Sequence, residues 1–66
     1  MQIQLNGEPR EVAADTTIDE LLKELQLDDR TLAVERNLQL VPRTEHMGVL
    51  LAEGDRLEVV TLVGGG

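Results

Sequence analysis

The chain has 66 residues and a formal net charge of −7, and it contains neither aromatic residues nor cysteine. A chain of this length forms one domain and has too little material to wall a deep substrate pocket, which argues against a free-standing enzyme. The absence of cysteine excludes disulfides and thiol chemistry, and the negative charge disfavours binding to nucleic acid or to an anionic membrane.

The first residues predict a β-hairpin. Apolar residues alternate with glutamines over the first five positions, which is the period of a strand with one buried face. Asn6 and Gly7 suit a two-residue turn in which both central residues have positive φ, so residues 8–14 are predicted to return as a second strand. Pro9 has no amide hydrogen to donate, which places this second strand at an edge of the sheet.

The same segment carries no targeting signal. It has neither a basic stretch nor a long apolar run, so we expect no signal peptide and no membrane anchor. The expected location is the cytoplasm.

One helix is predicted to begin near Ile18. Thr17 and Glu20 have the spacing of a capping box, in which each side chain accepts a hydrogen bond from the other residue's amide. The apolar residues that follow have the spacing of one helix face, and this face is expected to pack on the sheet. That stripe consists of Ile18, Leu21, Leu22 and Leu25.

The second half predicts three more strands. Two short apolar runs, 32–34 and 38–41, are separated by a tight connection over residues 35–37. Residues 43–52 have weak periodicity and are assigned as a loop. After a turn at Glu53-Gly54-Asp55, residues 56–63 are rich in β-branched and apolar residues and give the last strand. These elements predict an α+β fold with one main helix packed on one face of a mixed sheet.

Several polar residues are predicted to have no chemical role. Asp28 and Asp29 look like a solvated exit loop after the helix. His46 has no cysteine or second histidine with which to form a metal site, so it is expected to be an exposed loop residue and no metal is expected. The single lysine, Lys23, is assigned to the polar face of the helix, and Asp55 to turn chemistry.

The least ordinary feature is the end of the chain, Gly64-Gly65-Gly66. Many chain ends are simply frayed, but these glycines directly follow a strong strand and leave the terminal carboxylate free of neighbouring side chains. We expect a domain at 1–63 and a flexible glycine tail at 64–66. An α-carboxylate is ionised at neutral pH and can attack an activated phosphate to form an acyl-adenylate, which then reacts with sulfur, a thiol or an amine.

The whole chain resembles the thiamin-biosynthesis sulfur-carrier proteins. The resemblance rests on the ubiquitin-like order of elements, the Asn6-Gly7 hairpin, the segment from Ala33 to Arg43, the turn at 53–55 and the terminal glycines. It implies a β-grasp fold and a carrier that is itself not an enzyme. The family's typical aromatic residues near the last strand are replaced here by Leu62 and Val63.

The resemblance also implies the partners and the site. Gly66 would be adenylated by an ATP-dependent activating enzyme, receive sulfur from a persulfide donor protein as a thiocarboxylate, and pass it to thiazole synthase. Gly64 and Gly65 would thread into the partners' active sites. ATP would be used by the activating enzyme, and the domain itself would bind no cofactor.

A docking surface is predicted beside the tail. Val60 and Leu62 share the face of the last strand that carries charged residues, so they are exposed if that face points outward, whereas a twist or bulge would bury them. If exposed, they and Val63 would contact the partner enzymes. Two other functions stay open: a molybdopterin-synthase small subunit or another ubiquitin-like sulfur carrier, and a plain interaction module with a frayed tail.

Overall fold

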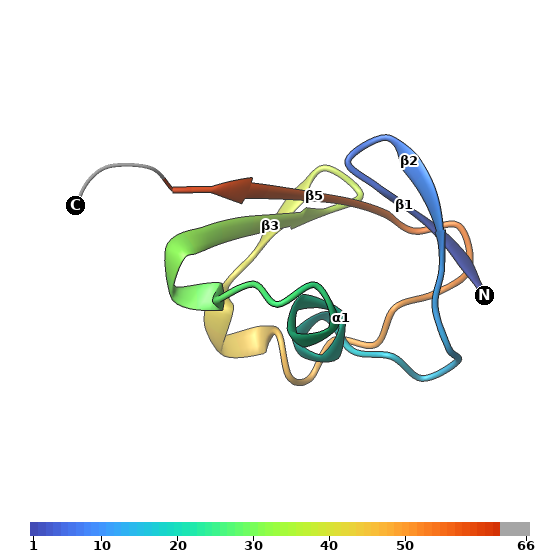
Figure 1. Ribbon diagram of the computed structural model, residues 1–66, viewed down its shortest axis with the longest axis horizontal. Helices are drawn as coiled ribbons and strands as arrows, with labels where there is room; N and C mark the ends of the chain where they lie inside the picture. The colour runs from blue at the N-terminus through green and yellow to red at the C-terminus, as the bar shows by residue number, and fades with distance from the viewer. Residues whose placement is uncertain (63–66) are drawn as a thin grey trace.

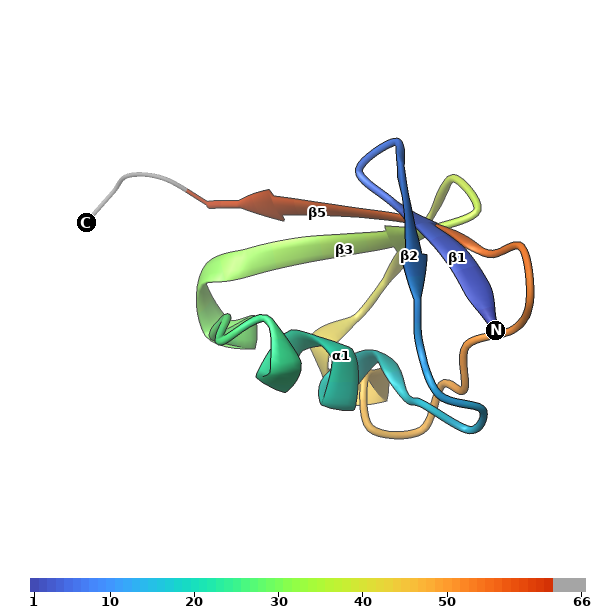
Figure 2. The same ribbon diagram turned by 45° about the vertical axis from the view of Figure 1, so that its right-hand side comes forward.

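A computed structural model describes residues 1–62 of the chain. Five strands form one mixed sheet in the order β2-β1-β5-β3-β4, in which β1 and β5 are parallel and the other neighbours are antiparallel. The helix α1 packs on one face of the sheet, and no element of the described chain covers the other face (Figures 1 and 2). The strands are β1 (Gln2–Leu5), β2 (Glu8–Glu11), β3 (Leu32–Arg36), β4 (Gln39–Val41) and β5 (Arg56–Thr61), and the helices are α1 (Ile18–Glu24) and the 3-10 turns η1 (Asp29–Thr31) and η2 (Arg43–Glu45). The predicted α+β arrangement is confirmed.

The first hairpin forms as predicted, with a shorter second strand. Asn6 and Gly7 have φ values of 52° and 84°, the positive values that the two-residue turn requires. β2 lies at the sheet edge, as the proline predicted. It ends at Glu11 and not at residue 14, because the chain turns away there: the Thr16 hydroxyl donates to the Ala13 carbonyl at 2.7 Å.

The helix begins where the capping box predicts. The Thr17 hydroxyl accepts from the Glu20 amide at 3.1 Å, and the Glu20 carboxylate accepts from the Thr17 amide at 2.9 Å. The apolar stripe of α1 meets the inner face of the sheet and forms one core with it. The buried core residues are Ile3, Val12, Ile18, Leu21, Leu22, Leu32, Val34, Leu51 and Leu57.

The β3–β4 connection is shorter than predicted. Glu35 and Arg36 continue β3, so that only Asn37 and Leu38 form the turn, and β4 begins at Gln39. Asn37 holds the turn to β5: its amide donates to the Arg56 carbonyl at 2.8 Å, and its side-chain oxygen accepts from the Arg56 amide at 3.0 Å. These two hydrogen bonds between Asn37 and the backbone of β5 set the length of β3. Local sequence does not reveal them, because β5 is distant in the chain.

Leu38 is an unfavourable residue for this turn. Its φ is 70°, a conformation that costs an L-residue about 1 kcal/mol, and its side chain is 81% exposed and so gains little from packing. We expect Leu38→Gly to raise the free energy of unfolding by about 0.5 kcal/mol, after the added entropy of glycine in the unfolded chain is subtracted. Urea unfolding measures this change.

Leu40→Gly is the matched control, because Leu40 is also exposed but lies within β4. Glycine in a strand interior should destabilise the protein by about 0.5–1 kcal/mol. Equal losses in both variants would contradict the assignment of strain to Leu38.

The last strand, β5, lies in the middle of the sheet and ends at Thr61, two residues before the predicted end. Leu62 leaves the ladder but stays attached, because its amide donates to the Thr31 carbonyl at 2.7 Å. The assignments of Val63 to the domain and of 64–66 to a tail lie outside the described residues and stay predictions. Within residues 1–62, no helix is both long and apolar enough to span a bilayer.

Candidate functional site

The candidate site is the end of β5 from which the glycine segment continues. Thr61 pairs with Leu32, and Leu62 is bonded to Thr31, the last residue of η1. The backbone is therefore hydrogen-bonded up to four residues before Gly66. In Figure 1 this end of β5 projects from the side of the sheet opposite the N-terminus of the chain.

The turn η1, which holds Leu62, is itself fixed by Asp28. The Asp28 carboxylate accepts from the Arg30 amide at 2.9 Å and from the Arg30 guanidinium, and the Thr31 hydroxyl donates to the Asp28 carbonyl. The side-chain hydrogen bond from Arg30 is the main cause that lowers the pKa of Asp28 to about 2. Asp28 is thus exposed, as predicted, but it caps a turn where only a solvated loop was expected.

Val60 and Leu62 are exposed, which settles the alternative that the sequence left open. Their exposed fractions are 56% and 62%, whereas Leu57, on the other face of β5, is 1% exposed. Burial alternates from Arg56 to Val60, Thr61 is exposed as well, and neither twist nor bulge buries Val60 or Leu62. Their exposure beside the end of β5 is what a docking surface requires.

A buried polar cluster at the opposite end of β5 fixes the start of that strand. Asp55 is 6% exposed and accepts hydrogen bonds from the Ala52 amide (2.8 Å), Arg36 Nε (2.8 Å) and Asn37 Nδ2 (3.1 Å). Burial of the carboxylate opposes ionisation, but these hydrogen bonds outweigh it and lower the pKa of Asp55. Asp55 is therefore more than a turn residue, since it ties the β3–β4 turn to β5.

The prediction that His46 is exposed is wrong. His46 is 1% exposed, its Nε2 donates to the Val41 carbonyl at 3.1 Å, and its backbone carbonyl accepts from the Asp19 amide at 3.0 Å. Its Nδ1 lies 4.0 Å from the Asp29 carboxylate. The histidine is buried because the segment after η2 passes under the start of α1, a contact between parts of the chain that are far apart in sequence. These hydrogen bonds join the segment after η2 to β4 and to the start of α1.

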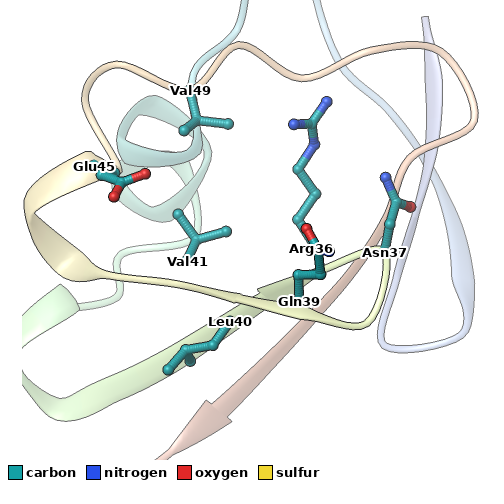
Figure 3. A pocket seen from close by; sticks show the side chains of 7 residues that line it. All are labelled: Arg36, Asn37, Gln39, Leu40, Val41, Glu45 and Val49. Carbon is teal, nitrogen blue, oxygen red and sulfur yellow. The ribbon is translucent and has the colours of Figure 1, made fainter.

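One open pocket of about 230 Å³ lies between the β3–β4 hairpin and η2, away from the end of β5 (Figure 3). Its lining includes Arg36, which is already paired with Asp55, and the apolar side chains of Val41 and Val49. No group of three potential metal ligands occurs in residues 1–62. The pocket therefore offers no set of reactive groups to compete with the strand end as the candidate site.

The comparison with protein families decides the class of the protein. The model of the ThiS family matches residues 3–66, almost the whole chain. The chain belongs to the ThiS family. This confirms the predicted family of ubiquitin-like sulfur carriers.

The relatives of this ThiS-family chain include a carrier of similar length and a much longer enzyme. The sulfur carrier protein ThiS of Bacillus subtilis is 38% identical over 65 residues, which cover 97% of this chain and 98% of the relative. A thiazole synthase of Paramagnetospirillum magneticum is 46% identical over all 66 residues, but the chain spans only 20% of that protein's length. The Bacillus subtilis relative, which matches this chain over almost its whole length, is a carrier, and this agrees with the prediction of a carrier and not an enzyme.

Solved structures confirm the predicted fold. The crystal structure of the thiamine biosynthesis protein ThiS from Geobacter metallireducens superposes with a TM-score of 0.86 at 29% identity, with both chains fully covered. A ubiquitin-like protein from Caldiarchaeum subterraneum gives a TM-score of 0.55 at 23% identity and covers 98% of this chain and all of that one, which is a likeness of fold alone. The sheet and helix of this ThiS-family chain are therefore those of the β-grasp fold.

The structure brings together only part of the predicted site. Val60 and Leu62 lie at the predicted place, whereas Val63 and the three glycines are outside the described residues. Sequence reasoning missed Leu40, which is 66% exposed and lies on the same open face of the sheet. The register of β4 against β3 is the signal that reveals it, and this register depends on the turn at Asn37-Leu38.

Proposed function

We propose that this ThiS-family chain is the sulfur carrier for formation of the thiazole ring of thiamin and that its carrier group is the Gly66 carboxylate. The observation that carries the proposal is the family match, which extends through the glycine segment to residue 66. The partners are an ATP-dependent activating enzyme, a persulfide sulfur donor and thiazole synthase. The domain contributes no catalytic side chain and binds no cofactor itself, because ATP is bound and consumed by the activating enzyme.

The chemistry proceeds in three steps. The Gly66 carboxylate attacks the α-phosphate of ATP, pyrophosphate leaves, and an acyl-adenylate forms. The terminal sulfur of a persulfide attacks the acyl carbon and AMP leaves; a thiol then cleaves the sulfur–sulfur bond and the thiocarboxylate remains. Thiazole synthase takes this sulfur, and hydrolysis returns the carboxylate.

The length and composition of the tail fit this role. From Leu62, the last described residue, the four remaining residues span at most about 14 Å when extended. A partner docked on the open face therefore has to place its reactive centre within that distance of the end of β5. Glycine lacks a side chain, so this segment is the narrowest that a polypeptide can offer to a confined active site.

The docking part of the proposal has its own prediction. Val60→Asp combined with Leu62→Asp places two charges where we propose apolar contact, and we expect loading by the activating enzyme to fall by about tenfold or more. Both side chains are exposed, so the fold should be retained. Loading rates and urea midpoints measured on the same samples test this. A folded variant that is loaded at the wild-type rate would sink the docking role.

Reconstitution tests the function as a whole. The chain is loaded with radioactive sulfur and offered to thiazole synthase or, separately, to the large subunit of molybdopterin synthase. We expect the label to appear in the thiazole product and to stay on the carrier in the second reaction. Transfer only in the second reaction would favour the molybdopterin alternative, and no loading at all would favour an interaction module.

A further inference from the structure

The open face of the sheet carries two glutamates opposite each other. Glu35 of β3 and Glu58 of β5 are register partners in an antiparallel pair, and both are exposed. Side chains so placed have Cβ atoms about 5 Å apart, and like charges in this arrangement destabilise a sheet. Within residues 1–62 neither carboxylate takes part in a salt bridge. The fold gains nothing from holding these two charges together.

Exposed apolar side chains lie on two sides of the pair, and Arg56, which makes no salt bridge with either glutamate, lies two residues before Glu58 on the same face of β5. Leu40 is the register partner of Glu35 on β4, and it projects from the opposite side of that strand to Val41, which faces the core (Figure 3). Val60 lies two residues beyond Glu58 on the same face of β5, in the direction of the tail. Together with the proposed docking surface of Val60 and Leu62, the glutamates therefore form a continuous area that is acidic at Glu35 and Glu58 and apolar toward β4 and toward the tail.

We propose that Glu35 and Glu58 together bind one arginine side chain of thiazole synthase when the carrier docks on it. The inference rests on the proposed function and specifies its partner, because relatives exist in which a segment like this chain is part of a thiazole synthase. A guanidinium presents several donors in a plane and can donate to both carboxylates at once. Docking also excludes water, which strengthens the attraction between the cation and the two anions.

Such a contact would orient the docked carrier. Apolar contacts at Leu40, Val60 and Leu62 bury surface but do not favour one orientation of the carrier. An arginine bound by both glutamates fixes the rotation of the sheet on its partner. That rotation determines where the end of β5 points. The pair is thus a specificity-determining element for delivery of the tail.

Binding of the full chain to purified thiazole synthase from the same cell tests the proposal, with three variants. Glu35→Gln with Glu58→Gln should weaken binding by about tenfold and reduce the dependence of Kd on salt. Glu24→Gln with Glu45→Gln is the matched control: it makes the same change in charge at two exposed residues of the helix side and should change Kd by less than about twofold. Glu35→Arg should raise Tm, because it creates an opposite-charge cross-strand pair, and should nevertheless weaken binding the most.

Equal losses in the two glutamine variants would overturn the proposal in favour of general attraction by the negative charge of the chain. Unchanged affinity of the Glu35→Arg variant would overturn it as well. Wild-type chain that is loaded with sulfur by the activating enzyme but does not bind thiazole synthase would contradict both this inference and the assignment of that partner. If the wild-type chain binds thiazole synthase and the variants at Glu35 and Glu58 bind it with the same Kd, the proposed function stands and the arginine contact is wrong.

Discussion

Deletion of Gly66 is expected to abolish sulfur loading while leaving the fold intact. The deletion draws the terminal carboxylate back by about 3.5 Å, and an error of even about 1 Å in the position of a reacting group can cost about a hundredfold in rate. The deleted residue lies beyond the last described hydrogen bond, from Leu62 to Thr31. The urea midpoint should therefore match that of the full chain.

Loading of the deleted chain is measured from its mass after incubation with ATP, activating enzyme and persulfide donor. Gly66→Ala is the companion variant, because it keeps the length and adds one methyl group. We expect it to be loaded more slowly than the wild type if the partner's channel is narrow. Normal loading of the deleted chain would contradict the assignment of the carrier group to the Gly66 carboxylate.

Asp55→Ala is expected to be the most destabilising single change outside the apolar core. It removes an acceptor of three hydrogen bonds and leaves the Ala52 amide and the Arg36 and Asn37 side chains without that partner. The loss should be about 2–4 kcal/mol, a large part of the roughly 3–10 kcal/mol typical of a domain of 66 residues. Urea unfolding measures it, with Glu24→Ala, an exposed helix position, as the near-neutral control.

The acid dependence of stability gives an independent reading of the same site. Because the folded-state pKa of Asp55 is lowered, its contribution is complete above the ordinary aspartate pKa of about 3.9 and is lost as pH falls through the folded value. Asp55→Asn should therefore be less stable than the wild type at neutral pH and should lose less stability on acidification. An acid profile parallel to that of the wild type would show that Asp55 does not contribute in this way.

Local sequence signals predicted most of the elements. The Asn6-Gly7 turn, the Thr17–Glu20 capping box and the apolar stripe of α1 each depend on residues within a few positions of one another, and all three occur as predicted. The edge position of β2 followed from the chemistry of Pro9 alone. The order of the strands in the sheet was implied by family resemblance and not by these local signals.

Features set by distant contacts were missed or predicted wrongly. His46 is buried because the segment after η2 passes under α1, where Ile18 donates to the Val49 carbonyl at 3.1 Å. Asp55 becomes a core acceptor only when β3 and β5 are paired. The opposition of Glu35 and Glu58 depends on strand register, which the sequence does not specify without knowledge of which strands are neighbours.

The candidate site also has a part that the structure tests and a part that rests on other grounds. The alternation of β5 placed Val60 and Leu62 on one face but left open whether that face is exposed or buried, and the structure shows both side chains exposed. The role of Gly66 rests on family membership and on the chemistry of a terminal carboxylate, and the described residues end before it.

Intact-protein mass spectrometry tests the central claim most directly. The 66-residue chain is incubated with ATP, a persulfide donor and the activating enzyme from the same cell, and that enzyme is first shown to be competent on its own carrier. We predict a gain of about 16 Da, as sulfur replaces one oxygen of the terminal carboxylate, and fragmentation should place it on Gly66. An unchanged mass with a competent enzyme, or a gain located on any other residue, would contradict the assignment of Gly66 as the sulfur-carrying group.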